Sequence, residues 1–275
     1  MKYVFRKKML EPLISNNISR YDIKDIEKCA ESGLSKFQRL YAESYLHGIG
    51  VSKDPVKAYK WLCKATEEMV KDKECSCPWR GNDIRAIALK GVLEYYGIGA
   101  EQDKPSGMSN LEKAADYGDT LAILNLAIIL YNEDKWRIAV KQLEQLAQRI
   151  VSNVKFEPFE AELYVFTHRM LAQCYIKGKG VKKSYHLTYM HWLLAAEVGD
   201  VDAIFNVALC YEQGIGVDKN DKMAFRYFYL ASRKYDVEGT IKLGDCYAHG
   251  IGVRKNSRKA MQCYNDAYML SLNAI

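Results

Sequence analysis

Two short segments of the sequence carry residue types that elsewhere bind phosphate or calcium. Residues 178–184 read GKGVKKS, but Lys182 occupies the place of the glycine that a phosphate-binding loop needs before its lysine, and no strand precedes the segment. Residues 218–223 read DKNDKM, where Lys222 replaces the third calcium ligand and Met223 replaces the required glycine. We interpret the first segment as a turn and the second as a turn that caps a helix.

The histidines show no catalytic arrangement. None has a serine or cysteine and a carboxylate in a recognisable nucleophile pattern. They are spread along the sequence as His47, His168, His186, His191 and His249. We therefore predict that the protein is not an enzyme and needs no cofactor.

The eight cysteines predict neither disulfides nor a metal site. Cys174, Cys210 and Cys246 recur every thirty-six residues, so in stacked helices they would lie about 10 Å apart, beyond the reach of a disulfide. The pair Cys75 and Cys77 lies in the segment DKECSCPWRGND, with no second pair of cysteines or histidines nearby. We predict free thiols and no bound metal, and leave the role of this segment open.

A repeated octet explains that spacing. CYIKGKGV, CYEQGIGV and CYAHGIGV follow one another at thirty-six residues, and SYLHGIGV and LEYYGIGA are weaker copies upstream. The distances between the earlier copies exceed whole periods by thirteen and nine residues, so particular units carry insertions. A unit of this length buries its apolar face only by stacking on neighbours, which predicts a solenoid whose function lies in a surface.

The fifth unit shows how the octet joins two helices. Apolar residues recur at helical spacing on both sides of a glycine loop. We expect Gly214 to end the first helix in a left-handed conformation and Gly216 to stand where a side chain would clash. Val217 should turn back to the core, and Asp221 or a neighbouring polar residue should cap the second helix.

The pattern resembles the Sel-one-like repeat family, relatives of the tetratricopeptide solenoids, over roughly residues 20–275. The segment YLHGIGVSKDPVKAYKWLCKAT, residues 45–66, carries the resemblance best, whereas residues 119–150 keep the helical pair without Gly-x-Gly. The resemblance implies an all-α fold, a right-handed α/α superhelix of about six helix-turn-helix repeats of about 36 residues. It also implies an adaptor or scaffold that binds a protein or peptide, with no catalytic residues.

We expect one elongated domain. Residues 1–33 would form N-terminal capping helices, one over residues 2–14 and one over residues 20–33. Residues 34–275 would form the solenoid, with an insertion near 70–82 and a degenerate repeat near 119–150. No capping helix follows the last unit, so its edge is a candidate homo-oligomer contact, with the apolar residues Met269, Leu270, Leu272 and Ile275 exposed.

Composition excludes several other classes of protein. The chain has 49% hydrophobic residues and only five prolines, which suits a fully folded chain. The longest apolar run, residues 121–130, is too short to cross a bilayer, and residues 1–17 lack the pattern of a secretory signal. We therefore predict a cytoplasmic protein without membrane contact.

The net charge of +6 leaves two kinds of partner open. Basic clusters at residues 7–8, 177–183 and 254–259 favour a partner with acidic patches, and a basic solenoid that associates with nucleic acid is the alternative. Because 34 acidic residues are interspersed and no nucleic-acid-binding motif is present, we prefer the protein partner. An enzyme is the weakest alternative.

The first helix of each repeat should line a concave groove, and its side chains away from the packing stripe should bind the partner. The same surface would serve a scaffold, a regulator or a dedicated inhibitor. Tyr96 and Phe205 are the strongest candidates, since aromatic side chains often dominate binding. The full predicted set comprises Arg39, Glu43, His47, Tyr96, Arg169, Gln173, Lys177, Phe205, Asn206, Gln213, Lys242, Asp245 and His249.

Overall fold

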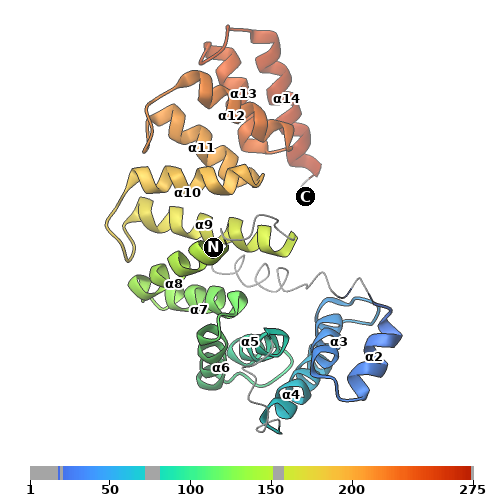
Figure 1. Ribbon diagram of the computed structural model, residues 1–275. Coiled ribbons are helices and arrows are strands. Elements are labelled where there is room, and N and C mark those ends of the chain that lie inside the picture. The colour runs from blue at the N-terminus through green and yellow to red at the C-terminus, as the bar shows by residue number, and fades with distance from the viewer. Residues whose placement is uncertain (1–17, 19–20, 72–80, 151–157, 274–275) are drawn as a thin grey trace. The chain divides into compact units, whose positions relative to one another are not determined.

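The computed structural model describes residue 18 and residues 21–71, 81–150 and 158–273 (Figure 1). These residues form helices and no strands, which confirms the predicted all-α class. In chain order the helices are α2 (Ile23–Glu31), α3 (Ser35–His47), α4 (Pro55–Lys71), α5 (Gly81–Tyr96), α6 (Lys104–Asp116), α7 (Thr120–Asn132), α8 (Trp136–Ile150), α9 (Pro158–Lys177), α10 (Tyr185–Glu197), α11 (Val201–Gln213), α12 (Asp221–Arg233), α13 (Val237–His249) and α14 (Ser257–Asn273).

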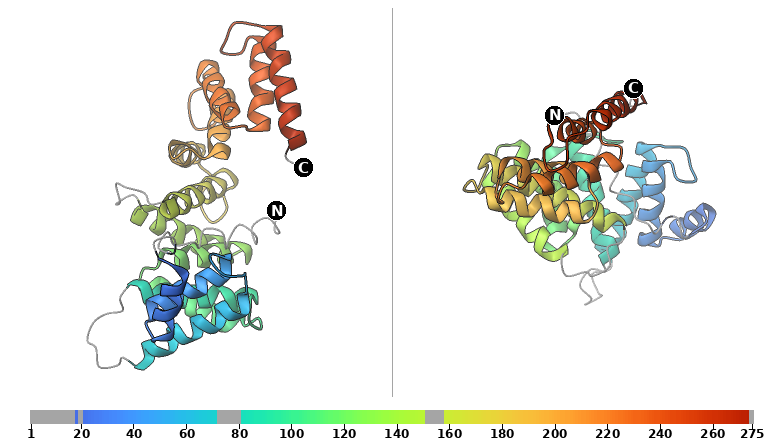
Figure 2. Two further views of the ribbon diagram at one scale, coloured as in Figure 1. Left: turned by 90° about the vertical axis from the view of Figure 1, so that its right-hand side faces the viewer. Right: turned by 90° about the horizontal axis from the view of Figure 1, so that it is seen from above.

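The chain divides into two compact units, residues 1–163 and residues 164–275. In the first unit α3 packs on α4, α5 on α6, and α7 on α8, and each pair also contacts the next. In the second unit α11 packs on α12 and α13 on α14, with α10 and α12 contacting the helix that follows them. Figure 2 shows α13 and α14 side by side in both views. Each unit is therefore a stack of successive helix pairs, as the sequence predicts.

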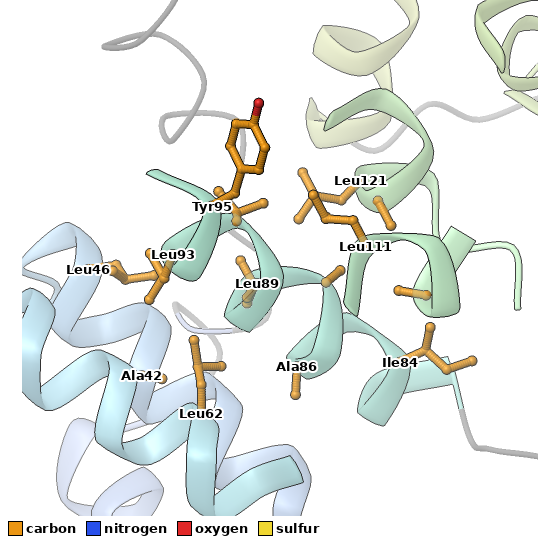
Figure 3. Packing of buried hydrophobic residues seen from close by; sticks show 14 of the residues in the cluster. Ala42, Leu46, Leu62, Ile84, Ala86, Leu89, Leu93, Tyr95, Leu111 and Leu121 are labelled. Atoms are coloured by element: carbon orange, nitrogen blue, oxygen red, sulfur yellow. The ribbon is translucent and has the colours of Figure 1, made fainter. Parts of the chain in front are cut away.

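Helix α5 is the centre of a large apolar core in the first unit. Figure 3 shows its side chains between those of α3 and α4 on one side and those of α6 and α7 on the other. Because α5 has neighbours on both sides, apolar residues recur around much of its surface rather than on one stripe. Fully buried members of this core include Leu62, Leu89, Leu93, Leu111 and Leu121.

The loop of the fifth repeat has the predicted geometry. Gly214 caps α11 in the left-handed conformation, with φ at 71°, and its N–H donates to the carbonyl of Cys210. The backbone N–H of Asn220 then donates to the carbonyl of Tyr211 at 2.9 Å, which closes the loop. The side chain of Asn220 accepts from the N–H of Met223 at 3.1 Å and caps α12. The predicted polar cap is therefore Asn220, the neighbour of Asp221.

The second glycine of the loop joins one repeat to the repeat before it. A Cβ atom placed on Gly216 would lie 1.9 Å from the carbonyl oxygen of Tyr185, at the start of α10. No side chain fits at that distance, so glycine is required for close approach as well as for its φ of 72°. The loop thus fixes how α11 and α12 stack on the preceding pair.

The third pair, α7 and α8, lacks that loop. The chain reverses through Glu133, Asp134 and Lys135, with Asp134 in a left-handed conformation at φ 61°. Aspartate tolerates this conformation better than most residues. The predicted helix over residues 2–14, the pair Cys75 and Cys77, and Ile275 lie outside the described residues.

The repeated cysteines are buried within the second unit. Cys174, Cys210 and Cys246 are free thiols, and burial raises the pKa of each to about 11. A raised pKa keeps the thiol protonated and unreactive near neutral pH. These cysteines therefore act as small apolar core residues.

Candidate functional site

Within each unit the first helices of successive pairs contact one another: α5 contacts α7, and Arg169 on α9 bonds to Asp200 at the start of α11. Aspartates cap the starts of three first helices, and each side chain accepts a backbone N–H in the first turn. The acceptors are Asp119 at 2.8 Å from Ala122 N, Asp200 at 2.8 Å from Ala203 N, and Asp236 at 2.7 Å from Gly239 N. A recurring carboxylate therefore lies at the junction between successive pairs, close to the predicted groove.

The second unit has a cavity of about 560 Å³ at two of these junctions. Side chains from α9, α10 and α11 line it, together with the connection between α12 and α13 and the first turn of α13. Of the predicted groove residues, four line this cavity: Arg169, Gln173, Phe205 and Asn206. The other lining residues are Trp192, Asp202, Tyr235, Asp236, Val237 and Glu238.

Arg169 connects two repeats at the cavity wall. From α9 its guanidinium donates to the carboxylate of Asp200 at 3.2 Å, and its other terminal nitrogen donates to Asp202. Both aspartates belong to the start of α11. The positive charge of Arg169 is therefore already neutralised within the protein.

Aromatic side chains supply the apolar part of the cavity. Trp192 is almost fully buried in the core of the second unit. Phe205 is half-buried, and its ring lies 5.8 Å from that of Phe228 on α12. The sequence predicted Phe205 as an exposed groove aromatic; the side chain is instead only partly exposed, because it packs against the core of the second unit as well as lining the cavity.

Tyr235 is the most exposed large hydrophobic residue among those described, at 77%. It also has a left-handed backbone, with φ at 63°. The corresponding residues before Asp119 and Asp200 are Gly118 and Gly199, with φ at 88° and 98°. A left-handed conformation costs a residue with a side chain about 1–2 kcal/mol, so Tyr235 is strained as well as exposed.

The sequence did not single out Tyr235, Asp236 or Glu238. A signal was present, because the repeat aligns KYD at residues 234–236 with YGD at residues 117–119 and VGD at residues 198–200. A tyrosine at a position that elsewhere holds glycine breaks the repeat where the backbone is most restrictive. The short segments that connect one helix pair to the next therefore mark candidate functional residues as clearly as the repeated octet marks the fold.

Two predicted groove residues of the first unit are buried and do not line a surface. Arg39 is 3% exposed and Glu43 is fully buried, and they form an ion pair one helical turn apart. Their helix, α3, packs against α2, α4 and α5, which leaves little of it facing solvent. The prediction that Arg39 and Glu43 bind a partner is therefore wrong. Buried charges persist only where they are paired, as here.

The other two predicted residues of the first unit are half-buried. Tyr96 packs against the core, and its ring meets that of Tyr95 at 5.0 Å in an edge-to-face arrangement. Burial lowers the pKa of His47. Neither Tyr96 nor His47 is among the residues that line the cavity of the second unit.

The remaining predicted residues of the second unit lie outside the cavity. Lys242 pairs with the carboxylate of Glu212 at 3.1 Å, and Asp245 accepts from the hydroxyl of Tyr264 at 2.8 Å. Both are therefore engaged within the protein. Lys177, Gln213 and His249 are exposed at the ends of their helices, α9, α11 and α13.

The last helix, α14, has an exposed apolar stripe. Met269 and Leu272 are exposed as predicted, whereas Leu270 is half-buried. Met261 and Tyr268 extend the stripe at helical spacing, with 62% and 64% of their surface exposed. A homo-oligomer contact at this edge stays a prediction.

Within the described part of the chain, no helix is long and apolar enough to cross a membrane. The same residues contain no cluster of three or more histidine, cysteine or acidic side chains that could hold a metal ion.

The stacked helix pairs and their glycine loops define an α-helical repeat protein of the solenoid class. The family comparison identifies the repeat as the Sel1 repeat, which matches residues 35–68, 86–119, 167–200, 201–236 and 237–272. The chain belongs to the Sel1 repeat family. Proteins of this family are in general scaffolds for protein–protein interactions, of a non-enzymatic type.

Solved structures share this fold. One is c5321, a protective antigen present in uropathogenic Escherichia coli strains, which displays an SLR fold. It is 22% identical in sequence, with a TM-score of 0.73, and the match covers 90% of this chain and 49% of that chain. The chain thus spans about half the length of that protein. Another is a Sel1 repeat protein from Oxalobacter formigenes, 21% identical with a TM-score of 0.64, over 86% of this chain and 89% of that chain. No curated protein matches the sequence.

Proposed function

We propose that the protein is an adaptor that holds a segment of a partner protein in the cavity of its second unit. One observation carries the proposal: the cavity gathers Arg169, Gln173, Phe205 and Asn206, four residues that the repeat pattern alone selects as groove residues. The cavity of about 560 Å³ is open and is lined by charged and polar side chains as well as by aromatic rings, so it offers polar and apolar contacts to a bound segment. A scaffold, a regulator and a dedicated inhibitor would all use this surface, and we propose the cytoplasm as its location.

Site-specific photo-crosslinking in the native cell tests this function. A benzophenone amino acid replaces Asn206, which lines the cavity, or Gln213, which lies on the same helix outside it. We expect a protein to cross-link through position 206 and not through position 213, and mass spectrometry of the cross-linked peptide identifies the bound segment. Equal cross-linking at both positions would contradict binding in the cavity.

A cavity-filling variant gives an independent readout. Gln173→Trp should exclude the partner, because the larger side chain occupies the space that the segment needs, whereas Gln213→Trp adds the same ring to an exposed position. We expect the cross-linked partner to be lost from purifications with the first variant only. Retention of every specific partner by both variants would refute the proposal.

A further inference from the structure

The last helix of the second unit, α14, is covered on fewer sides than the matching helix of the preceding pair. Helix α12 packs on α11 within its own pair and also on α13 of the next pair. Helix α14 packs on α13, and no other helix of the described chain packs on it to a comparable extent. The face of α14 that corresponds to the α13 side of α12 is therefore open.

The two helices can be compared position by position. Each follows a capping asparagine, Asn220 before α12 and Asn256 before α14, so matching residues are thirty-six apart. On α12 the ring of Phe225 packs edge-to-face on that of Tyr247 of α13, with the ring centroids 5.4 Å apart. The matching residue of α14 is Met261, which is exposed. A position that contacts the next helix on α12 is thus uncovered on α14.

A second position shows the same difference. Gly239, on α13, lies so close to α12 that a Cβ atom added to it would be 2.7 Å from the Cβ of Ala231 and 3.5 Å from the backbone nitrogen of Ser232. The residue of α14 that matches Ser232 is Tyr268, which is exposed. Where α12 holds a small residue beneath a helix, α14 therefore presents a large ring to solvent.

These residues belong to one seam along α14. Three of the seam residues are large and apolar, and all five are exposed. Their spacing alternates between three and four residues, as in helices that pack side by side. The seam comprises Arg258, Met261, Asn265, Tyr268 and Leu272. Because exposed apolar side chains gathered on one face mark an interaction site, the seam suits a further helix.

The start of the seam is strongly basic. Arg254 and Lys255 precede α14, Arg258 and Lys259 lie in its first turn, and all four are exposed. Residues 250–265 contain no aspartate or glutamate. None of the four cations forms an ion pair with an acidic side chain of the described chain. Four positive charges are therefore left without a negative partner there.

The repeat itself does not require this charge. In the matching loop before α12, Asp218 and Asp221 accompany two lysines, and Lys219 pairs with Asp221 at 3.7 Å. Before α14 the positions of the two aspartates hold Arg254 and Ser257. The loop before α12 forms without a net charge, so the basic start of α14 is a departure from the repeat that folding does not explain.

We propose that the α14 seam docks an amphipathic helix of a partner protein, which has apolar side chains along one face and acidic side chains where it crosses the start of α14. The packing of α13 on α12 favours a helix as the occupant, and the four unpaired cations favour acidic residues on it. A second copy of this chain, which the sequence predicts for this edge, matches less well, because its own seam contains no acidic residue.

The inference goes beyond the proposed function, since it concerns a second surface. None of the residues that line the cavity belongs to α14. The partner helix at the seam and the segment in the cavity can therefore be tested separately.

Two designed peptides test the docking. Each has three heptads with leucine at the seam positions. Beside the seam in the first heptad, one peptide has glutamate and the other has glutamine. Fluorescence anisotropy of the labelled peptides measures their binding to the full chain. We expect the glutamate peptide to bind about tenfold more tightly, as a few solvent-exposed charge pairs would give.

Substitutions in the protein supply matched controls. Met261→Gln combined with Tyr268→Gln should abolish the binding of both peptides, because it removes the apolar part of the seam. Arg254→Asp combined with Ser257→Asp restores the two acids of the preceding repeat, and should remove most of the preference for glutamate. Tyr229→Gln changes a tyrosine that is also exposed but lies on α12, and should alter neither binding constant.

Three results would overturn the proposal. The first is equal binding of the two peptides, or no binding of either. The second is binding of the glutamate peptide that survives the loss of Met261 and Tyr268, because only a general attraction to the basic loop would then remain. The third comes from sedimentation of the parent chain alone: a dimer that the same double variant loses would assign the seam to a second copy. The cross-linking at position 206 tests the adaptor function independently of all three.

Discussion

Replacing Gly216 with alanine is expected to destabilise the second unit far more than replacing Gly214, two residues earlier. Both glycines have nearly the same left-handed backbone, with φ at 71° for Gly214 and 72° for Gly216. Their surroundings differ: a Cβ on Gly214 meets its nearest neighbours at 3.6 Å, whereas a Cβ on Gly216 meets the Tyr185 carbonyl oxygen at 1.9 Å. The pair therefore separates the cost of the conformation from the cost of the close approach.

The magnitudes follow from the two distances. Gly214→Ala adds only the left-handed strain, about 1–2 kcal/mol. Gly216→Ala adds the same strain, and the start of α10 must also retreat by about 1.4 Å to restore an ordinary carbon–oxygen contact of about 3.3 Å. Such overpacking costs about 1–3 kcal/mol more, so we expect a total of about 2–5 kcal/mol.

Urea unfolding of both variants and of the parent measures the difference. Because the chain has two compact units, hydrogen exchange of the amides in α10 and α11 assigns the loss to the junction. We expect these amides to lose protection in the Gly216 variant and to keep most of it in the Gly214 variant. Equal destabilisation of the two variants would show that the loop does not rest on Tyr185, and the reasoning would fail.

Three further predictions concern single side chains. Burial raises the pKa of Cys174 to about 11, so iodoacetamide at pH 8 should modify it roughly a hundredfold more slowly than an ordinary exposed thiol; peptide mass spectrometry measures this, and equal rates would contradict the burial. Burial, with the charge of His191, lowers the pKa of His168 to about 3. The stability that neutral His168 contributes is therefore complete above about pH 6.5 and is lost as the pH falls toward 3, by about 1.4 kcal/mol per pH unit at most. Urea midpoints at pH 7, 6 and 5 should fall less steeply for His168→Gln than for the parent, and parallel curves would refute the assignment. Finally, Tyr235→Gly should raise the free energy of unfolding by up to about 1 kcal/mol by relieving left-handed strain; urea unfolding measures the change, and a loss of stability would show that the ring contributes to folding.

The repeat pattern predicted most of the fold because it reports local constraints. Glycine at position 214 is the residue that a left-handed helix cap demands, and alanines and aromatics at helical spacing mark the faces that pack. These requirements act within one repeat, so they can be read from a single sequence. The capping residue was predicted only to within a residue, since Asn220 and Asp221 are both good caps.

Burial of the groove residues could not be predicted in the same way. Transferring the helical wheel of the fifth repeat to the first assumes that the same face is open in each repeat. Helix α3 breaks this assumption because α2, α4 and α5 cover it, so Arg39 and Glu43 are buried although the matching positions of the second unit are at least partly exposed. How many helices cover a given helix depends on its place in the stack. The sequence of a single repeat carries no information about that place.

The cavity combines two departures from the repeat that each oppose stability. Tyr235 holds a backbone conformation that glycine adopts at the matching positions, and the cap Asp236 lacks the ion pair with an arginine that the caps Asp119 and Asp200 have among the described residues. Either departure alone could be a tolerated irregularity. Their convergence on one cavity is what we expect where binding rather than folding determines the residues, because local rules of a fold are broken most often at functional sites.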